Sequence, residues 1–147
     1  MSISDTSLNS AWWALRIGLG SAAFLAGLDK FTNLLTNWQI YLNPLVERLL
    51  PVTGSTFMHV VGVIEIIVGL MILTRWTRLG GYIAMLWLAL IALSLISAAM
   101  FFDVAVRDLQ MAIAAYTLAR LTEVRQSATE PRPLKVSGHT SNSILAR

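Results

Sequence analysis

Four stretches of this 147-residue chain are almost wholly apolar, and they constrain its fold more than any other feature of the sequence. They cover residues 11–28, 57–73, 79–100 and 104–121. Each is close to the ~20 residues that an α-helix needs to cross about 30 Å of hydrocarbon. Because 56% of the residues are hydrophobic and only 13% are charged, a soluble domain is excluded. The sequence therefore predicts an all-α integral membrane protein, built as a four-helix bundle of four spans.

The link between the first and second stretches is too long for a turn and has its own helical pattern. Apolar residues recur at intervals of three and four between Phe31 and Leu49, with polar residues on the other face. Pro44 would open a second piece of helix, and Pro51 would end it. We expect one or two amphipathic helices that lie on the outer membrane surface between spans one and two.

Basic residues beside the apolar stretches predict the orientation of the chain. Arg75 and Arg78 lie in the short link between spans two and three, and further Arg and Lys residues follow span four. Both termini are then expected in the cytoplasm. Since these residues anchor helices in a lipid bilayer, the net charge of +3 does not indicate nucleic-acid binding.

Three segments follow from this division of the chain. Residues 1–10 are expected to be a short cytoplasmic N-terminus, residues 11–122 the membrane domain, and residues 123–147 a disordered cytoplasmic tail. The tail combines prolines with many Ser and Thr residues and lacks apolar periodicity. The chain has no cysteine, which excludes disulfides and thiol chemistry.

Charged residues inside the apolar stretches are the candidates for function, because an unpaired charge in a membrane is costly. On the first span, Arg16, Gly20, Gly27 and Lys30 share one helix face. Glycines on such a face let a neighbouring helix approach closely. Arg16 either has a buried partner or extends to the headgroups, and Lys30, at the outer boundary, is expected to extend to the headgroups.

Glu65 lies on the second span, on the face that also holds His59, Gly62 and Gly69. Two alternatives differ in function. Paired with Arg107 or Arg16, Glu65 would stay ionised and clamp two helices together, whereas an unpaired Glu65 would hold a proton near neutral pH and could carry it.

The fourth span carries Arg107 and Asp108 about one turn from its outer end. Asp108 heads a stripe of small residues, Ala112, Ala115 and Ala119, that predicts a tight helix interface. Together these residues predict a pocket for a small ligand or a proton. Its expected residues are Glu65, Arg107, Asp108 and Arg16, with Lys30 and His59 as secondary candidates and no metal.

With these residues in place, the chain resembles the DoxX family of small four-span bacterial membrane proteins. The resemblance rests on Arg16 and the glycines leading to "GLDKF", on "VGVIEIIVGLMIL" around Glu65, and on "FFDVAVRDLQMAIAAYTLARL" around Arg107 and Asp108. It covers residues 11–122. It implies a bacterial inner-membrane location and association with membrane oxidoreductases, since the family is named after subunits of a thiosulfate:quinone oxidoreductase.

The leading hypothesis is a non-catalytic membrane subunit of a quinone-linked or thiol/redox system, rather than an autonomous enzyme. No covalently bound cofactor is expected, and a quinone is the candidate ligand. Its expected partners are the bilayer, a membrane or peripheral oxidoreductase, and a second copy of the chain. The alternatives are a small-solute transporter, which would require oligomerisation, and a scaffold or assembly factor with structural ion pairs.

Overall fold

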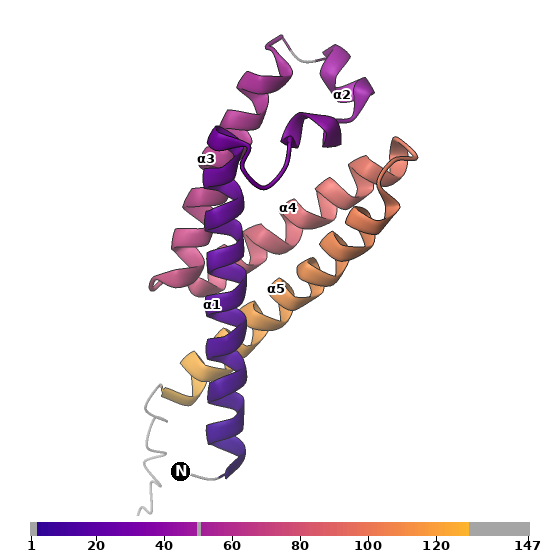
Figure 1. Cartoon of the computed structure of the whole chain (residues 1–147). Helices are drawn as coiled ribbons and strands as arrows, with labels where there is room; N and C mark the ends of the chain where they lie inside the picture. The colour runs from indigo at the N-terminus through magenta and orange to yellow at the C-terminus, as the bar shows by residue number, and fades with distance from the viewer. Residues whose placement is uncertain (1–2, 50, 130–147) are drawn as a thin grey trace, which may run out of the picture.

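The computed structural model describes residues 3–49 and 51–129, and within these ranges every regular element is a helix (Figure 1). The all-α prediction is confirmed. The elements are α1 (Ile3–Thr32), the 3₁₀ helix η1 (Trp38–Tyr41), α2 (Pro44–Leu49), α3 (Gly54–Leu73), α4 (Thr77–Ser97) and α5 (Phe102–Thr129).

Three of the described helices, α1, α3 and α4, are long and apolar enough to cross a membrane. This property indicates a multi-pass membrane protein. Helix α5 is also long enough, but it is more highly charged, with Arg107, Asp108 and Arg120 between residues 104 and 121.

Several element boundaries differ from the predicted ones. Helix α1 begins at Ile3, so residues 3–10 of the predicted N-terminal segment are helical. Helix α5 runs on to Thr129, so the prediction that a disordered tail begins at residue 123 is wrong for residues 123–129. An ion pair between Arg120 and Glu123, one turn apart, supports this extension. The rest of the predicted tail, residues 130–147, lies outside the described residues.

The long link holds two short helices in place of the expected amphipathic ones. Helix α2 begins at Pro44, as predicted. The first predicted piece is wrong, because α1 continues to Thr32 and only the short η1 follows. We refer to residues 33–49, which contain η1 and α2, as the cap segment.

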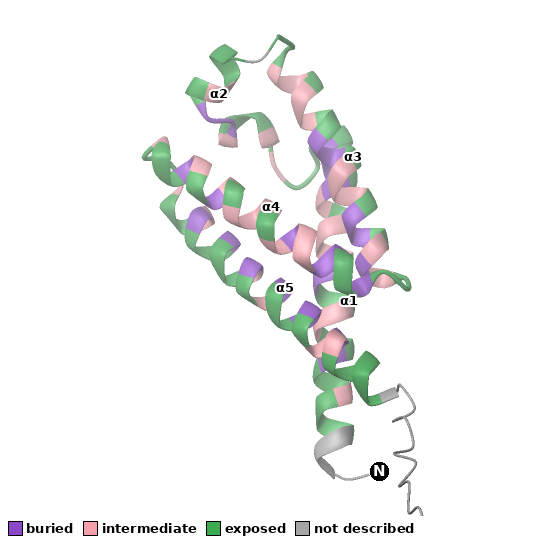
Figure 2. Cartoon of the chain, turned by 180° about the vertical axis from the view of Figure 1, so that it is seen from behind, coloured by how far each residue is buried: buried purple, intermediate pink, exposed green. Residues whose placement is uncertain are grey.

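The helices pack as two antiparallel pairs, which we name the first hairpin (α1 and α3) and the second hairpin (α4 and α5). In Figure 1 the second hairpin crosses the first near the lower end of α3 and diverges from it toward the cap segment. The buried residues follow the faces that the helices turn toward one another (Figure 2). Where the hairpins cross, the core is apolar and includes Trp12, Leu19, Ile72, Ala84 and Leu118.

Glycines set the separation of α1 and α3. A Cβ atom on Gly27 would lie 2.6 Å from the carbonyl oxygen of Gly62, and one on Gly62 would lie 2.7 Å from the carbonyl oxygen of Gly27. Only glycine fits at both positions, because the obstructing atoms belong to the backbone. The small-residue face predicted for each of these helices is therefore the interface between them.

The predicted stripe below Asp108 is also an interface. Ala115 and Ala119 are fully buried. A Cβ on Gly81 of α4 would lie 3.1 Å from the carbonyl oxygen of Ala115, so α4 and α5 also approach closely.

Candidate functional site

A cavity of about 650 Å³ lies between the two hairpins. Residues from α1, α3, α4, α5 and the cap segment line it, and most of them are apolar. Its charged lining residues are Lys30, Glu65, Arg107 and Asp108. We name it the inter-hairpin cavity.

Lys30 and Glu65 form an ion pair within this cavity. The distance from Lys30 Nζ to Glu65 Oε2 is 2.5 Å, and the side chains are only 4% and 13% exposed. The ammonium group also lies 3.7 Å from the centre of the Trp38 ring, which adds a cation–π contact. Lys30 is therefore held by a carboxylate from α3 and an aromatic ring from the cap segment.

This ion pair corrects two predictions. Glu65 pairs with neither Arg107 nor Arg16, and Lys30 does not extend to the headgroups. The cause is the packing of α1 against α3. Side chains lean toward the N-terminus of their own helix, so on antiparallel helices Lys30 and Glu65 lean toward each other. Lys30 passes over Gly62, which has no side chain to block it.

Asp108 lies beside the ion pair and is 6% exposed. Its carboxylate lies 3.6 Å from Nε of Arg107, the preceding residue. The Arg107 side chain is 61% exposed, so it lines the cavity only at its edge. Asp108 is also close enough to Lys30 to attract it. The carboxylates of Glu65 and Asp108 and the ammonium group of Lys30 thus line the same cavity.

Arg16, a predicted pocket residue, does not line the inter-hairpin cavity. Its guanidinium donates hydrogen bonds to the carbonyl oxygens of Ile72 (3.0 Å), Leu73 (2.8 Å) and Thr74 at the C-terminal end of α3. It also stacks on Trp12. Because these carbonyls end a helix and lack partners within it, Arg16 is a helix cap.

His59, a secondary candidate, is exposed on α3 and also lies outside the cavity lining. Its ring stacks on Phe31 with the centroids 5.0 Å apart and an interplanar angle of 6°. The structure thus brings together Glu65, Arg107, Asp108 and Lys30 from the predicted set, and places Arg16 and His59 elsewhere.

Asp29 is a site residue that the sequence reasoning missed. It is 5% exposed and accepts hydrogen bonds from the backbone N–H groups of Leu34 (2.8 Å) and Leu35 (3.0 Å). It also accepts one from the Trp38 indole, at 2.8 Å. Asp29 therefore positions the ring that covers Lys30. The available signal was an aspartate at a helix C-terminus, which is unfavourable unless it caps the following loop.

Asn43 fixes the other end of the cap segment. Its Nδ2 donates to the Ser94 carbonyl oxygen (3.0 Å) and to Ser97 Oγ (3.1 Å) near the end of α4. Its Oδ1 accepts from the N–H of Leu45 in the first turn of α2. Asp29 and Asn43 together tie the cap segment to both hairpins.

Trp87 of α4 contributes an indole to the cavity lining. Its N–H group is buried and lacks a hydrogen-bond partner of normal geometry among the described residues, although it lies near Glu65. A buried donor of this kind is available to a ligand. Within residues 3–49 and 51–129, no three His, Asp or Glu side chains are grouped closely enough to hold a metal ion.

Comparison of the chain with protein-family models, with curated proteins and with solved structures finds no match. The function must therefore be argued from the cavity and its residues.

Proposed function

We propose that this chain is a four-span membrane protein that binds a small amphipathic molecule in the inter-hairpin cavity. The observation that carries the proposal is the cavity itself, a largely apolar space of about 650 Å³ with charged residues gathered in one part. Ligand sites typically occupy about 300–1,000 Å³ and combine apolar walls with a few placed polar groups. The Lys30–Glu65 pair, Asp108 and the Trp87 N–H group would bind the polar end of such a ligand.

The exposed face of α5 supports the proposal that this helix is a fourth span. Helix α5 packs along α4, one of the three apolar candidates. Away from α4 it exposes Val106 (56%) and Ile113 (66%). An apolar outer face on a helix beside a span fits lipid better than water. Arg107, near the outer end, has a stem long enough to bring its charge to the headgroups.

A quinone-like molecule fits the chemistry of the lining residues. Trp38, Tyr41 and Trp87 offer aromatic faces for a ring, and alanines of α1 leave room for an apolar tail. A quinone supplies redox chemistry and takes up protons on reduction, and Glu65 and Asp108 could hold those protons. The resemblance to the DoxX family adds the proposal of a redox-linked subunit in a bacterial inner membrane, with both termini cytoplasmic.

A cavity-filling substitution tests the proposal without touching the ion pair. Ala26 lines the cavity, so Ala26→Phe should block it, whereas Ala14→Phe places the same ring on an exposed part of α1. The full chain in detergent would be titrated with decylubiquinone while tryptophan fluorescence is recorded, since Trp38 and Trp87 line the cavity.

We expect saturable quenching in the wild type and in Ala14→Phe, and an affinity at least about tenfold lower in Ala26→Phe. Thermal unfolding of each variant checks that it is folded. Equal quenching in all three proteins would contradict binding in the cavity.

A scaffold is the second candidate, and the Lys30–Glu65 pair favours it because this contact joins α1 to α3 without any ligand. The scaffold hypothesis predicts no saturable ligand binding in wild type. The transport hypothesis used Arg16 and Glu65 on one route, and Arg16 lies outside the cavity. Solute uptake by vesicles containing only this protein would be needed to support it.

A further inference from the structure

A second pocket lies where α3 turns into α4, at the end of α3 opposite the cap segment. It is a shallow depression, open to the surface, and is lined by Arg75, Trp76, Arg78, Leu79 and Tyr82. We name it the turn pocket. The proposed ligand of the inter-hairpin cavity makes no use of it.

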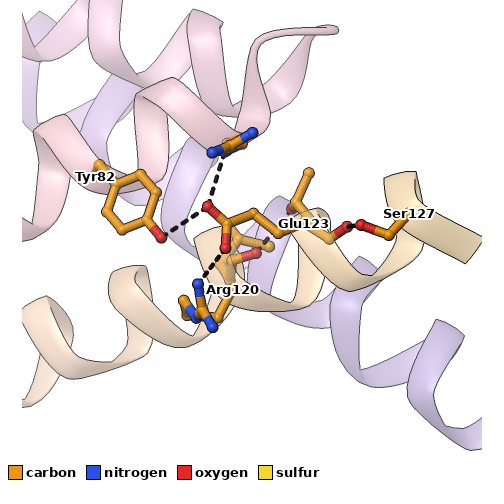
Figure 3. A network of polar contacts seen from close by, with 7 residues as sticks. Tyr82, Arg120, Glu123 and Ser127 are labelled. Carbon is orange, nitrogen blue, oxygen red and sulfur yellow. Dashed lines mark hydrogen bonds and ion pairs between the residues drawn. The ribbon is translucent and has the colours of Figure 1, made fainter.

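Figure 3 shows the polar network of Glu123 with Tyr82 and Arg120. The same carboxylate holds Arg78, one of the two arginines in this pocket. Glu123 of α5 accepts a hydrogen bond from the Tyr82 hydroxyl at 3.0 Å, and the same oxygen lies 2.9 Å from Nε of Arg78. Its other carboxylate oxygen pairs with Arg120. Since Glu123 is bound to Nε of Arg78, the terminal amino groups of that guanidinium remain available for a ligand.

The charge of this region is unbalanced. Arg78 and Arg120 share the single carboxylate of Glu123, and both side chains are 56% exposed. Arg75 is exposed and forms no hydrogen bond or ion pair with the other residues that the structure describes. An anion that entered the turn pocket would therefore meet a surplus of guanidinium groups, which bind phosphate oxygens in pairs.

The position of the turn pocket indicates which anion it meets. Helices α3 and α4 are both long and apolar enough to cross a membrane, and the turn pocket lies at the end that they share. Beside the arginines, Trp76 is 56% exposed and Leu79 is 49% exposed. Tryptophan is typical of the membrane interface, and basic pockets between spanning helices bind lipid headgroups.

We propose that the turn pocket binds the phosphate group of an anionic phospholipid, with Arg75 and Arg78 as its ligands and Trp76 and Leu79 against the glycerol and upper acyl chain. This site is separate from the inter-hairpin cavity, so its test does not depend on the proposed function.

The test compares Arg75→Gln with Arg48→Gln. Arg75 is exposed and forms no hydrogen bond or ion pair with another described residue, so its replacement should leave the fold intact. Arg48 is an exposed arginine on α2, in the cap segment. Thermal unfolding of the full chain in detergent would be followed during titration with dioleoylphosphatidylglycerol, dioleoylphosphatidylcholine or inorganic phosphate. Native mass spectrometry would count the bound lipids.

We expect phosphatidylglycerol to stabilise the wild type and Arg48→Gln more than phosphatidylcholine does. In Arg75→Gln the half-saturating concentration of phosphatidylglycerol should rise roughly fivefold, as expected for one basic residue near an anionic lipid. The same response in both variants would overturn the proposal. Equal stabilisation by inorganic phosphate would also overturn it, since the site would then take a soluble anion.

Discussion

Replacing either member of the Lys30–Glu65 pair alone should destabilise the protein more than replacing both. The side chains are 4% and 13% exposed, so Glu65→Gln leaves a buried ammonium group without its carboxylate. Breaking a buried ion pair in this way costs about 3–5 kcal/mol. For a chain of this size, about 2–4 °C in Tm corresponds to each kcal/mol, so the expected loss is about 6–20 °C.

Lys30→Met should cost more than Glu65→Gln. It removes the same ion pair and also the cation–π contact with Trp38, in which the charge lies 3.7 Å from the ring centre. Such a contact contributes up to about 2 kcal/mol when it is shielded from water. It also leaves Glu65 without its partner and Asp108 without a nearby attracting charge.

The assay is thermal unfolding in detergent, followed by circular dichroism, for wild type, both single variants and the double variant. We expect the double variant to be more stable than either single variant, and so far more stable than the sum of the single losses predicts. Arg107→Gln is the matched control. Its side chain is 61% exposed, so it should cost about 1 kcal/mol or less and add to Glu65→Gln without coupling. Additive losses for Lys30 and Glu65, or coupling of Glu65 to Arg107 instead, would refute the reasoning.

Three further predictions concern the helix interface, the Glu123 network and the cap segment. Gly27→Ala should destabilise the protein by about 1–3 kcal/mol in the same unfolding assay, because the new Cβ meets backbone atoms of α3. Gly18→Ala is the control: a Cβ at this position meets no atom within 4 Å, so the change should be neutral or stabilising. The hydrogen bond from Tyr82, followed by attraction to Arg78 and Arg120, lowers the pKa of Glu123 despite the opposing effect of burial. The contribution of the ionised Glu123 carboxylate to stability should be complete above pH 4.5, the ordinary pKa of a glutamate, and lost as the pH falls through the lower pKa of the folded protein. Glu123→Gln should therefore lose less stability than the wild type over that acid range. Identical pH profiles for the two proteins would contradict this. Asp29→Ala should speed hydrogen exchange of the Leu34 and Leu35 amides, because their N–H groups donate hydrogen bonds to the Asp29 carboxylate. Asp103→Ala, at the exposed start of α5, should leave their exchange unchanged.

The helices and their contact faces could be predicted from local sequence patterns. Gly20 and Gly27 of α1 lie four and three residues from Arg16 and Lys30, and Gly62 and Gly69 of α3 lie three and four residues from Glu65. This spacing predicts one close-packed face on each helix. The alanine stripe below Asp108 predicted the interface with α4 in the same way. These features depend only on the periodicity of a helix, so the sequence specifies them directly.

The partner of Glu65 could not be predicted because it depends on how the two helices align. The spacing of Lys30 from Gly27 matches that of Glu65 from Gly62, but this becomes informative only once Gly27 is known to meet Gly62. The sequence prediction paired Glu65 with Arg107 or Arg16 and placed Lys30 at the membrane boundary. It ignored the backward lean of side chains, which on antiparallel helices brings Lys30 and Glu65 together.

The cap segment was difficult for a different reason. Its conformation depends on a hydrogen bond that Asp29 accepts from the Trp38 indole and on one that Asn43 donates to the Ser94 carbonyl oxygen. An amphipathic period describes only one face of a helix and cannot show such bonds. The cap segment was therefore predicted as a surface helix, whereas Asp29 and Asn43 hold it in place, and the amphipathic pattern singled out neither residue.

The grouping of the helices into hairpins has a consequence for biogenesis. The first hairpin contains both Lys30 and Glu65, and the second contains both Arg107 and Asp108. A lone charge at the centre of a spanning helix costs roughly 2.5–3.5 kcal/mol during insertion. During synthesis α1 and α3 emerge first, and they can neutralise their own buried charges before α4 and α5 exist. In the proposed four-span arrangement, the chain would enter the bilayer as two successive units, each of which holds an ion pair of its own.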